Sequence, residues 1–116
     1  SVIYFSASRL MDLFSYSSFD FKGKEEAEET FRDIYDCDLL IIDDLGTELA
    51  NSFTTSQFFL CLNERMLRKK STIISTNLKI EEIADIYSER VFSRILSCYT
   101  IIKMFGDDIR MKKRIH

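Results

Sequence analysis

The sequence predicts an α/β domain organised around a parallel β-sheet. Residues 39–42 are four consecutive aliphatic side chains, and Asp43 and Asp44 follow them directly. A strand without apolar–polar alternation suits the interior of a parallel sheet that is covered on both faces. Segments with strand character alternate along the chain with segments of helical period, which favours parallel strands joined by right-handed crossovers. We therefore expect a three-layer arrangement, with the sheet between two layers of helices.

Size and composition fit one small domain. The chain has 116 residues, of which 46% are hydrophobic and 30% are charged, enough for a single core. No apolar stretch has the length of a membrane span, so no membrane partner is expected. The three cysteines are far apart and the one histidine is the last residue, which argues against a zinc site. We expect reduced thiols in a cytoplasmic protein.

The first half of the chain is predicted as a strand, two helices and the central strand. Residues 2–5 are apolar, β-branched and aromatic, as is typical of a strand. Ser6 or Ser8 can cap a helix in which apolar side chains recur at helical spacing. After a loop at 19–23, residues 24–35 predict a second helix, because its glutamates lie in the first turns, where the helix dipole favours them.

The second half of the chain continues the alternation. A helix is predicted over residues 54–69, with Thr54 or Thr55 as its cap, and a β-branched strand over residues 72–75. Helical spacing then recurs over residues 80–87 and again after Ser88. Residues 99–104 are predicted as a last strand. The expected order of elements is therefore β-α-α-β-α-β-α-α-β.

Polar side chains follow two neighbouring strands of this predicted sheet. Asp43 and Asp44 follow the central strand, and Asn77 comes soon after the strand over residues 72–75. The carboxyl ends of parallel strands meet at one edge, where ligands bind in open α/β sheets. Adjacent carboxylates there can hold Mg²⁺ and orient a water, and an amide can position a water or a phosphate oxygen. An ordinary turn after the strand, and a helix-capping role for Asn77, are the alternatives.

Three arginines are further candidates. Arg90 and Arg94 lie four residues apart on one predicted helix and therefore share a face, an arrangement of like charges that costs a few tenths of a kcal/mol. Glu89 does not share that face. The pair indicates an anionic ligand, with a solvated face as the alternative, while Arg110 is an isolated cation beyond the last predicted strand. No phosphate-binding loop of the form Gly-x-x-x-x-Gly-Lys-[Ser/Thr] occurs in the sequence.

Together the motifs resemble the DnaC/DnaI-type helicase loaders, which are AAA+ ATPases with the IstB transposition helpers as close relatives. Five segments in the family's order carry the resemblance: residues 39–48, 62–65, 73–78, 87–95 and 106–110. On this resemblance, residues 1–116 form a single partial AAA+ domain of the P-loop NTPase type, from Walker B to sensor II. The family's first strand and phosphate loop would precede Ser1.

The resemblance implies roles for the residues at the sheet edge. Asp43 is similar to the Walker B aspartate that holds Mg²⁺ through water. Asp44 stands where the acid that activates the attacking water is expected, and both are candidate metal ligands. Asn77 matches the polar sensor I residue, which contributes to catalysis and to nucleotide binding.

The resemblance also implies roles for the arginines and for the whole protein. Arg94 is the best match for the arginine finger given to a neighbouring subunit's ATP, Arg90 is the second, and Arg110 resembles the nucleotide-sensing sensor II arginine. The implied function is ATP- and Mg²⁺-dependent loading of a DnaB-type replicative helicase onto single-stranded DNA, with self-association through AAA+ interfaces. An IstB-like transposition helper ATPase and a non-hydrolysing module that binds helicase or DNA are the alternatives.

The missing phosphate-loop strand has consequences for the expected sheet. In the family that strand lies between those corresponding to residues 72–75 and 99–104. Unpaired strand edges invite pairing with other chains. We therefore expect the last strand to close directly onto the strand at 72–75, or a second chain to fill the gap. Packing of the segment from Tyr99 onward outside the family arrangement is the alternative.

Overall fold

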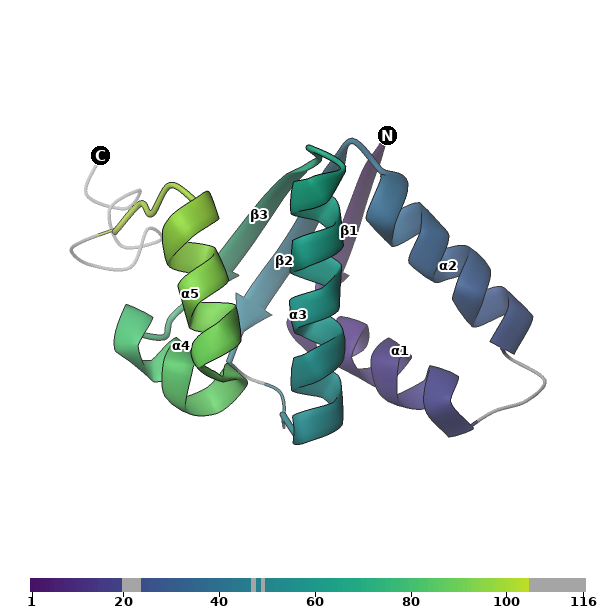
Figure 1. The fold of residues 1–116 in the computed structure, drawn as a ribbon, viewed down its shortest axis with the longest axis horizontal. Coiled ribbons are helices and arrows are strands. Elements are labelled where there is room, and N and C mark those ends of the chain that lie inside the picture. Colours follow the sequence, from purple (N-terminus) through teal and green to yellow (C-terminus); the bar gives the residue numbers. More distant parts are fainter. Residues whose placement is uncertain (20–23, 47, 49, 105–116) are drawn as a thin grey trace, which may run out of the picture.

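The computed structural model describes residues 1–19, 24–46, 48 and 50–104. Within these residues three strands alternate with five helices, as predicted up to the last helix (Figure 1). The elements in chain order are β1 (Val2–Ser6), α1 (Ala7–Phe19), α2 (Lys24–Asp36), β2 (Leu39–Leu45), α3 (Ser52–Leu67), β3 (Ser71–Thr76), α4 (Ile80–Tyr87) and α5 (Glu89–Cys98). None of the described helices combines the length and the apolar character needed to cross a membrane.

The three strands form one parallel sheet in the order β1-β2-β3. Because each strand lies beside the next one in the chain, right-handed crossovers place the connecting helices on the same face. On that face Leu40 and Ile42 are fully buried. The buried side chains that the helices contribute to this core include Leu10, Phe14, Ile34, Phe58, Leu62, Tyr87, Val91 and Ile95.

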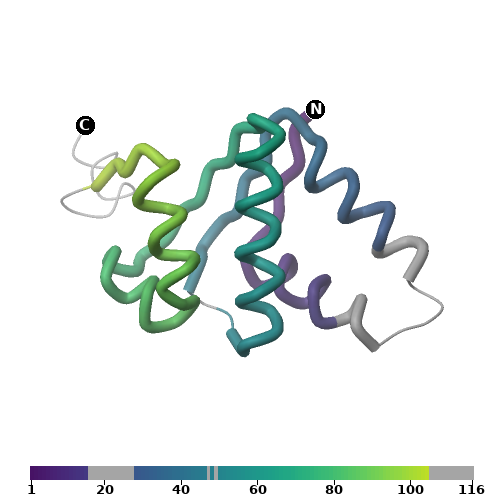
Figure 2. The backbone as a smooth tube through the Cα atoms, in the orientation of Figure 1, coloured from purple at the N-terminus to yellow at the C-terminus, as the bar shows by residue number. Residues whose placement is uncertain are grey.

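The opposite face of the sheet is exposed. Val2, Tyr4 and Ile73 alternate with the covered positions of β1 and β3, and their exposed fractions are 64%, 59% and 52%. The described residues therefore supply one of the two helical layers expected for the sandwich. The chain path in Figure 2 shows the N-terminal end beside the start of β2, where the Ser1 ammonium lies 2.5 Å from the Asp38 carboxylate.

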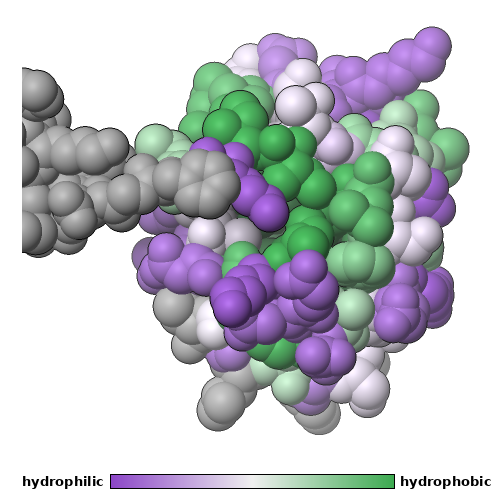
Figure 3. Space-filling model, turned by 90° about the vertical axis from the view of Figure 1, so that its left-hand side faces the viewer, coloured by the Kyte–Doolittle hydropathy of each residue, from purple (hydrophilic) through white to green (hydrophobic). Residues whose placement is uncertain are grey.

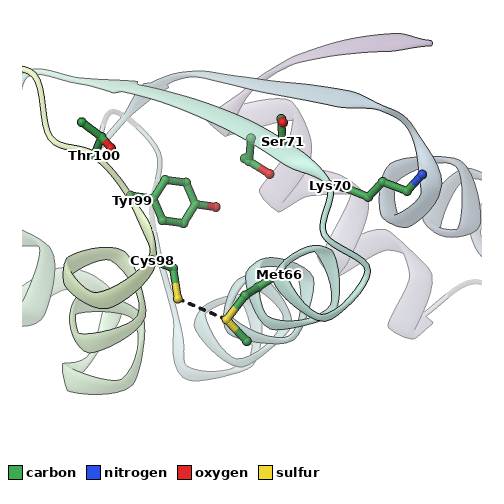
Figure 4. A pocket seen from close by; sticks show the side chains of 7 residues that line it. Met66, Lys70, Ser71, Cys98, Tyr99 and Thr100 are labelled. Atoms are coloured by element: carbon green, nitrogen blue, oxygen red, sulfur yellow. Dashed lines mark hydrogen bonds between the residues drawn. The ribbon is translucent and has the colours of Figure 1, made fainter.

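The predicted strand over residues 99–104 does not form. These residues are described, none of them is in a strand, and β3 pairs only with β2 in the described part of the chain. The prediction that this segment closes directly onto β3 is therefore wrong, and residues 99–104 lie outside the sheet. A cavity of about 440 Å³ is lined by residues of both β3 and this segment, which do not pair as neighbouring strands (Figure 4). Pairing of β3 with a second chain stays a prediction.

Helix starts are set by capping side chains. Ser6, not Ser8, accepts from a backbone N–H in the first turn of α1, that of Arg9 at 3.2 Å. Asn51, and neither Thr54 nor Thr55, caps α3: its side chain accepts from the Thr54 N–H, and Thr54 Oγ1 accepts from the Asn51 backbone N–H at 3.0 Å. This reciprocal pair is a capping box, which satisfies two backbone donors at the start of the helix.

A buried arginine connects α3 to its neighbours at the opposite end of the sheet from the candidate site. Arg65 is fully buried. Its guanidinium donates to the backbone oxygens of Ile34 at 2.5 Å and Ser71 at 2.6 Å, and to Thr72 Oγ1 at 2.9 Å. The same group lies 3.3 Å from Cys37 Sγ. One side chain thus joins the end of α2, the start of β3 and α3.

Candidate functional site

The carboxylate of Asp43 lies at the carboxyl end of β2 between two hydroxyl donors. Tyr4 of β1 donates to Asp43 Oδ2 at 2.6 Å, and Ser75 of β3 donates to Oδ1. The hydrogen bonds from Ser75 and then Tyr4 lower the pKa of Asp43, because they stabilise its charged form. The same contact raises the pKa of Tyr4. Asp43 is therefore an oriented, ionised carboxylate at neutral pH.

An irregularity in the sheet separates Asp43 from Asp44. The register between β2 and β3 shifts between Ile42 and Leu45, and Asp44 has a positive φ of 61°. Its backbone N–H donates to Ser75 Oγ at 2.9 Å, so Ser75 contacts both acidic residues. Bulges of this kind redirect side chains and are frequent beside active sites.

The donor set fits the chemistry of Mg²⁺. This ion is usually held by one or two carboxylates together with waters and substrate phosphates, not by a complete protein cage. Asp43 and Asp44 supply two carboxylates that are consecutive in the chain, and the Asp43 carboxylate keeps acceptor capacity beyond its two hydroxyl contacts. Among the described residues, no group of three or more histidine, cysteine or acidic side chains could hold a metal.

Asn77 lies at the same edge of the sheet. Leu45 and Thr76 are paired across β2 and β3, and the Thr76 hydroxyl donates to the Leu45 backbone oxygen at 2.6 Å. The structure thus brings the residues after these two strands together, as the sequence predicted. Lys79, not Asn77, is the cap residue of α4, so the helix-capping alternative for Asn77 is excluded. Asn77 is exposed and available to solvent at this edge.

The loop after β2 is held by contacts that the sequence did not reveal. Gly46 has φ +108°, and a Cβ at this position would lie 2.6 Å from Leu78 Cγ. Its backbone N–H donates to Glu48 Oε2 at 3.0 Å, while the Tyr87 hydroxyl donates to Oε1 of the same carboxylate. Burial and then the Glu48 contact raise the pKa of Tyr87. Glu48 thereby connects the turn after the acidic pair to α4.

Arg90 and Arg94 lie away from this edge, on the surface that α5 shares with α3. Both guanidinium groups lie over the ring of Phe59, with distances from Cζ to the ring centroid of 4.1 and 5.7 Å. Arg94 Nη1 is 3.4 Å from Met66 Sδ, and Arg94 Nε is buried without a hydrogen-bond partner among the described residues. A cavity of about 320 Å³ adjoins the pair. Arg110 lies outside the described residues.

Figure 3 views the molecule from the side of α4 and α5 and shows hydrophobic surface bordered by hydrophilic residues. Neither Arg90 nor Arg94 forms an ion pair with a side chain in the described ranges. This face therefore carries two guanidinium groups that no described carboxylate pairs directly, with Glu89 in the lining of the same cavity.

Three solved structures share this arrangement of elements. The crystal structure of the DnaC helicase loader matches with a TM-score of 0.70 and 20% identity, over 84% of this chain and 58% of that one. AMPPCP-bound DnaA from Aquifex aeolicus matches with a TM-score of 0.70 and 24% identity, over 87% of this chain and 30% of that one. The fold is of the DnaC/AAA+ type.

The third match has the same fold. A DNA replication initiation factor aligns with a TM-score of 0.74 and 23% identity, over 98% of this chain and 33% of that one. The chain thus spans less than two thirds of each matched protein. No protein-family model and no curated protein sequence matches it. The predicted α/β fold with a parallel sheet of the AAA+ type is confirmed.

Proposed function

We propose that this chain is part of a DNA-replication ATPase that loads a DnaB-type helicase onto single-stranded DNA. The observation that carries the proposal is the meeting of Asp43, Asp44 and Asn77 at one sheet edge, in a fold shared with the DnaC helicase loader. In this proposal the protein works in the cytoplasm, uses ATP and Mg²⁺, and self-associates through AAA+ interfaces.

The residues at the sheet edge have distinct tasks in this proposal. Asp43 holds hydrated Mg²⁺, and its two hydroxyl contacts keep the carboxylate oriented. Asp44 accepts the proton of the attacking water, and Asn77 orients that water or a phosphate oxygen. When bound, Mg²⁺ neutralises charge on the phosphates of ATP. Ser75 supports both acids, because it contacts each of them.

The phosphates need a cradle that this sequence does not contain. Without the glycine-rich backbone N–H groups and the lysine of a phosphate loop, the 116-residue chain should bind Mg-ATP weakly. Isothermal titration calorimetry tests this expectation. A micromolar dissociation constant would contradict it.

Arg94 acts on the nucleotide of a neighbouring subunit in this proposal. In an assembled ATPase, Arg94→Ala should abolish hydrolysis and leave nucleotide binding intact, because arginine fingers are worth roughly 10³–10⁵ in rate. Arg90→Ala is the matched comparison on the same helix. Near-normal turnover of Arg94→Ala with loss in Arg90→Ala would assign the finger to Arg90.

Helicase loading itself is tested by binding. The chain is mixed with a hexameric DnaB-type helicase and with labelled single-stranded or duplex DNA, and complexes are separated by size-exclusion chromatography. Co-elution with the helicase, and preference for single strands, are the expected results. Binding of duplex DNA without helicase would favour the IstB-like alternative instead.

A non-hydrolysing module is the second candidate, and one observation favours it. Both oxygens of Asp43 already accept protein hydroxyl groups. This candidate predicts that Asp43→Asn and Asp44→Asn leave helicase co-elution unchanged, with or without ATP. Loss of an ATP-dependent complex in both variants would refute it.

A further inference from the structure

Phe59 lies beneath both arginines of α5. The ring belongs to α3, while Arg90 and Arg94 come from successive turns of α5. The guanidinium of Arg90 lies 4.1 Å from the ring centroid, and that of Arg94 lies 5.7 Å from it. One aromatic ring therefore contacts two cations, and this geometry brings their charges to one place on the surface.

The two arginines are not paired for stability. No carboxylate in the described part of the chain lies within ion-pair distance of either, although Glu89 lines the adjoining cavity. Like charges four residues apart destabilise a helix, and a buried donor without an acceptor costs more. Arg94 Nε is such a donor. An anion in the cavity would offset the repulsion between the two positive charges.

The cavity has the donors that a phosphate group requires. Its volume is about 320 Å³, and its lining combines the two arginines with Ser93, Ser97 and Glu89. The Ser97 hydroxyl already donates to the Arg94 backbone oxygen at 3.3 Å, which leaves the guanidinium groups as the main donors. Arginine binds phosphate oxygens through several N–H groups in a fixed planar geometry. A long flexible arginine loses rotamer entropy on binding, and a ring that holds it beforehand reduces that loss.

We propose that Phe59 is a positioning residue that holds Arg90 and Arg94 together for the terminal phosphate of a nucleotide presented by another molecule. This inference rests on the proposed function, and it adds the residue that orients the arginine pair. Arg94 is the more fixed of the two, since Met66 and the ring both contact it. Arg90 is exposed, and its guanidinium lies over the ring.

The test uses the 116-residue chain and inorganic tripolyphosphate as the probe. Binding is followed by NMR through the side-chain Nε–H signals of the two arginines. Phe59→Leu keeps an apolar side chain but removes the ring, and should weaken binding about tenfold through loss of two cation–π contacts. Phe59→Tyr retains the ring and should bind as the unmodified chain does.

Two controls separate positioning from folding and from the wider proposal. Phe53→Leu makes the same change on an exposed residue of the same helix, and should alter neither binding nor the arginine signals. The double variant Arg90→Ala with Arg94→Ala should abolish binding. If it does so while Phe59→Leu binds normally, the positioning role is refuted and the arginine site stands. If the double variant still binds, the site itself is refuted.

Discussion

Replacing Arg65 by alanine should destabilise the fold more than any other single charge removal on α3. The guanidinium is fully buried and donates to the backbone oxygens of Ile34 and Ser71 and to Thr72 Oγ1. No carboxylate in the described residues pairs with it, so carbonyl dipoles compensate its charge. One of these carbonyls lies in the last turns of α2, at the negative end of the helix dipole.

The expected loss in the free energy of unfolding follows from the groups that Arg65→Ala leaves unsatisfied. Two backbone oxygens lose a charged donor, and unsatisfied buried groups cost about 1–3 kcal/mol each. Loss of the aliphatic part of the side chain leaves a cavity, which destabilises the fold further. Removal of the buried charge offsets part of the destabilisation. We expect a loss of about 3–5 kcal/mol, a large share of the roughly 5–15 kcal/mol available to a domain. Arg65→Lys should lose less than Arg65→Ala, because the ammonium keeps a charged donor and the aliphatic chain. It should still lose some stability, because one ammonium cannot reach all three acceptors.

Urea denaturation followed by circular dichroism measures the change in the free energy of unfolding. The comparison is valid when the variants share the same dependence of that free energy on urea concentration. Arg68→Ala is the matched control, since Arg68 follows Arg65 by one turn and pairs with Asp36 and Glu64 at the surface. Exposed pairs are worth about 0–1 kcal/mol. Arg65→Ala with a loss no larger than that of Arg68→Ala would refute the reasoning.

Three further predictions concern the site and the thiols. Gly46→Ala should cost about 1–3 kcal/mol, because a Cβ would lie 2.6 Å from Leu78 Cγ and φ is +108°; an unchanged urea midpoint would contradict this. Tyr4→Phe should raise the pKa of Asp43 in an NMR titration, since a hydrogen bond to the charged form is lost. Folding lowers the pKa of Asp43, so ionised Asp43 stabilises the folded state at pH values above its pKa in the unfolded chain. This stabilisation is lost as the pH falls through the pKa of Asp43 in the folded state. No change in that titration would show that the hydroxyl contact is absent in solution. Cys98 should react first with a thiol reagent, because it is exposed with a lowered pKa and the other two thiols are buried; mass spectrometry of the labelled peptides identifies the site, and earlier labelling of a buried thiol would be the contrary result.

The local pattern of the sequence was sufficient to predict most helices and strands and the residues that lie at the carboxyl edge of the sheet. Strand and helix periods are carried by neighbouring residues, so β1 to β3 and α1 to α5 follow from spacing alone. The juxtaposition of Asp43 and Asn77 also follows, since parallel strands end at one edge. Their roles in catalysis stay predictions, because side-chain placement does not demonstrate chemistry.

Tertiary structure decided what depends on partners distant in the chain. Residues 99–104 have strand composition but no neighbouring ladder, and a strand cannot form without one. Arg65 looks in the sequence like a surface cation near a helix end, yet the carbonyls that receive it come from α2 and β3. Tyr4 and Ser75 reach Asp43 only through the register of three strands. Such contacts arise from packing between elements, and the periodicity of any single segment contains no record of them.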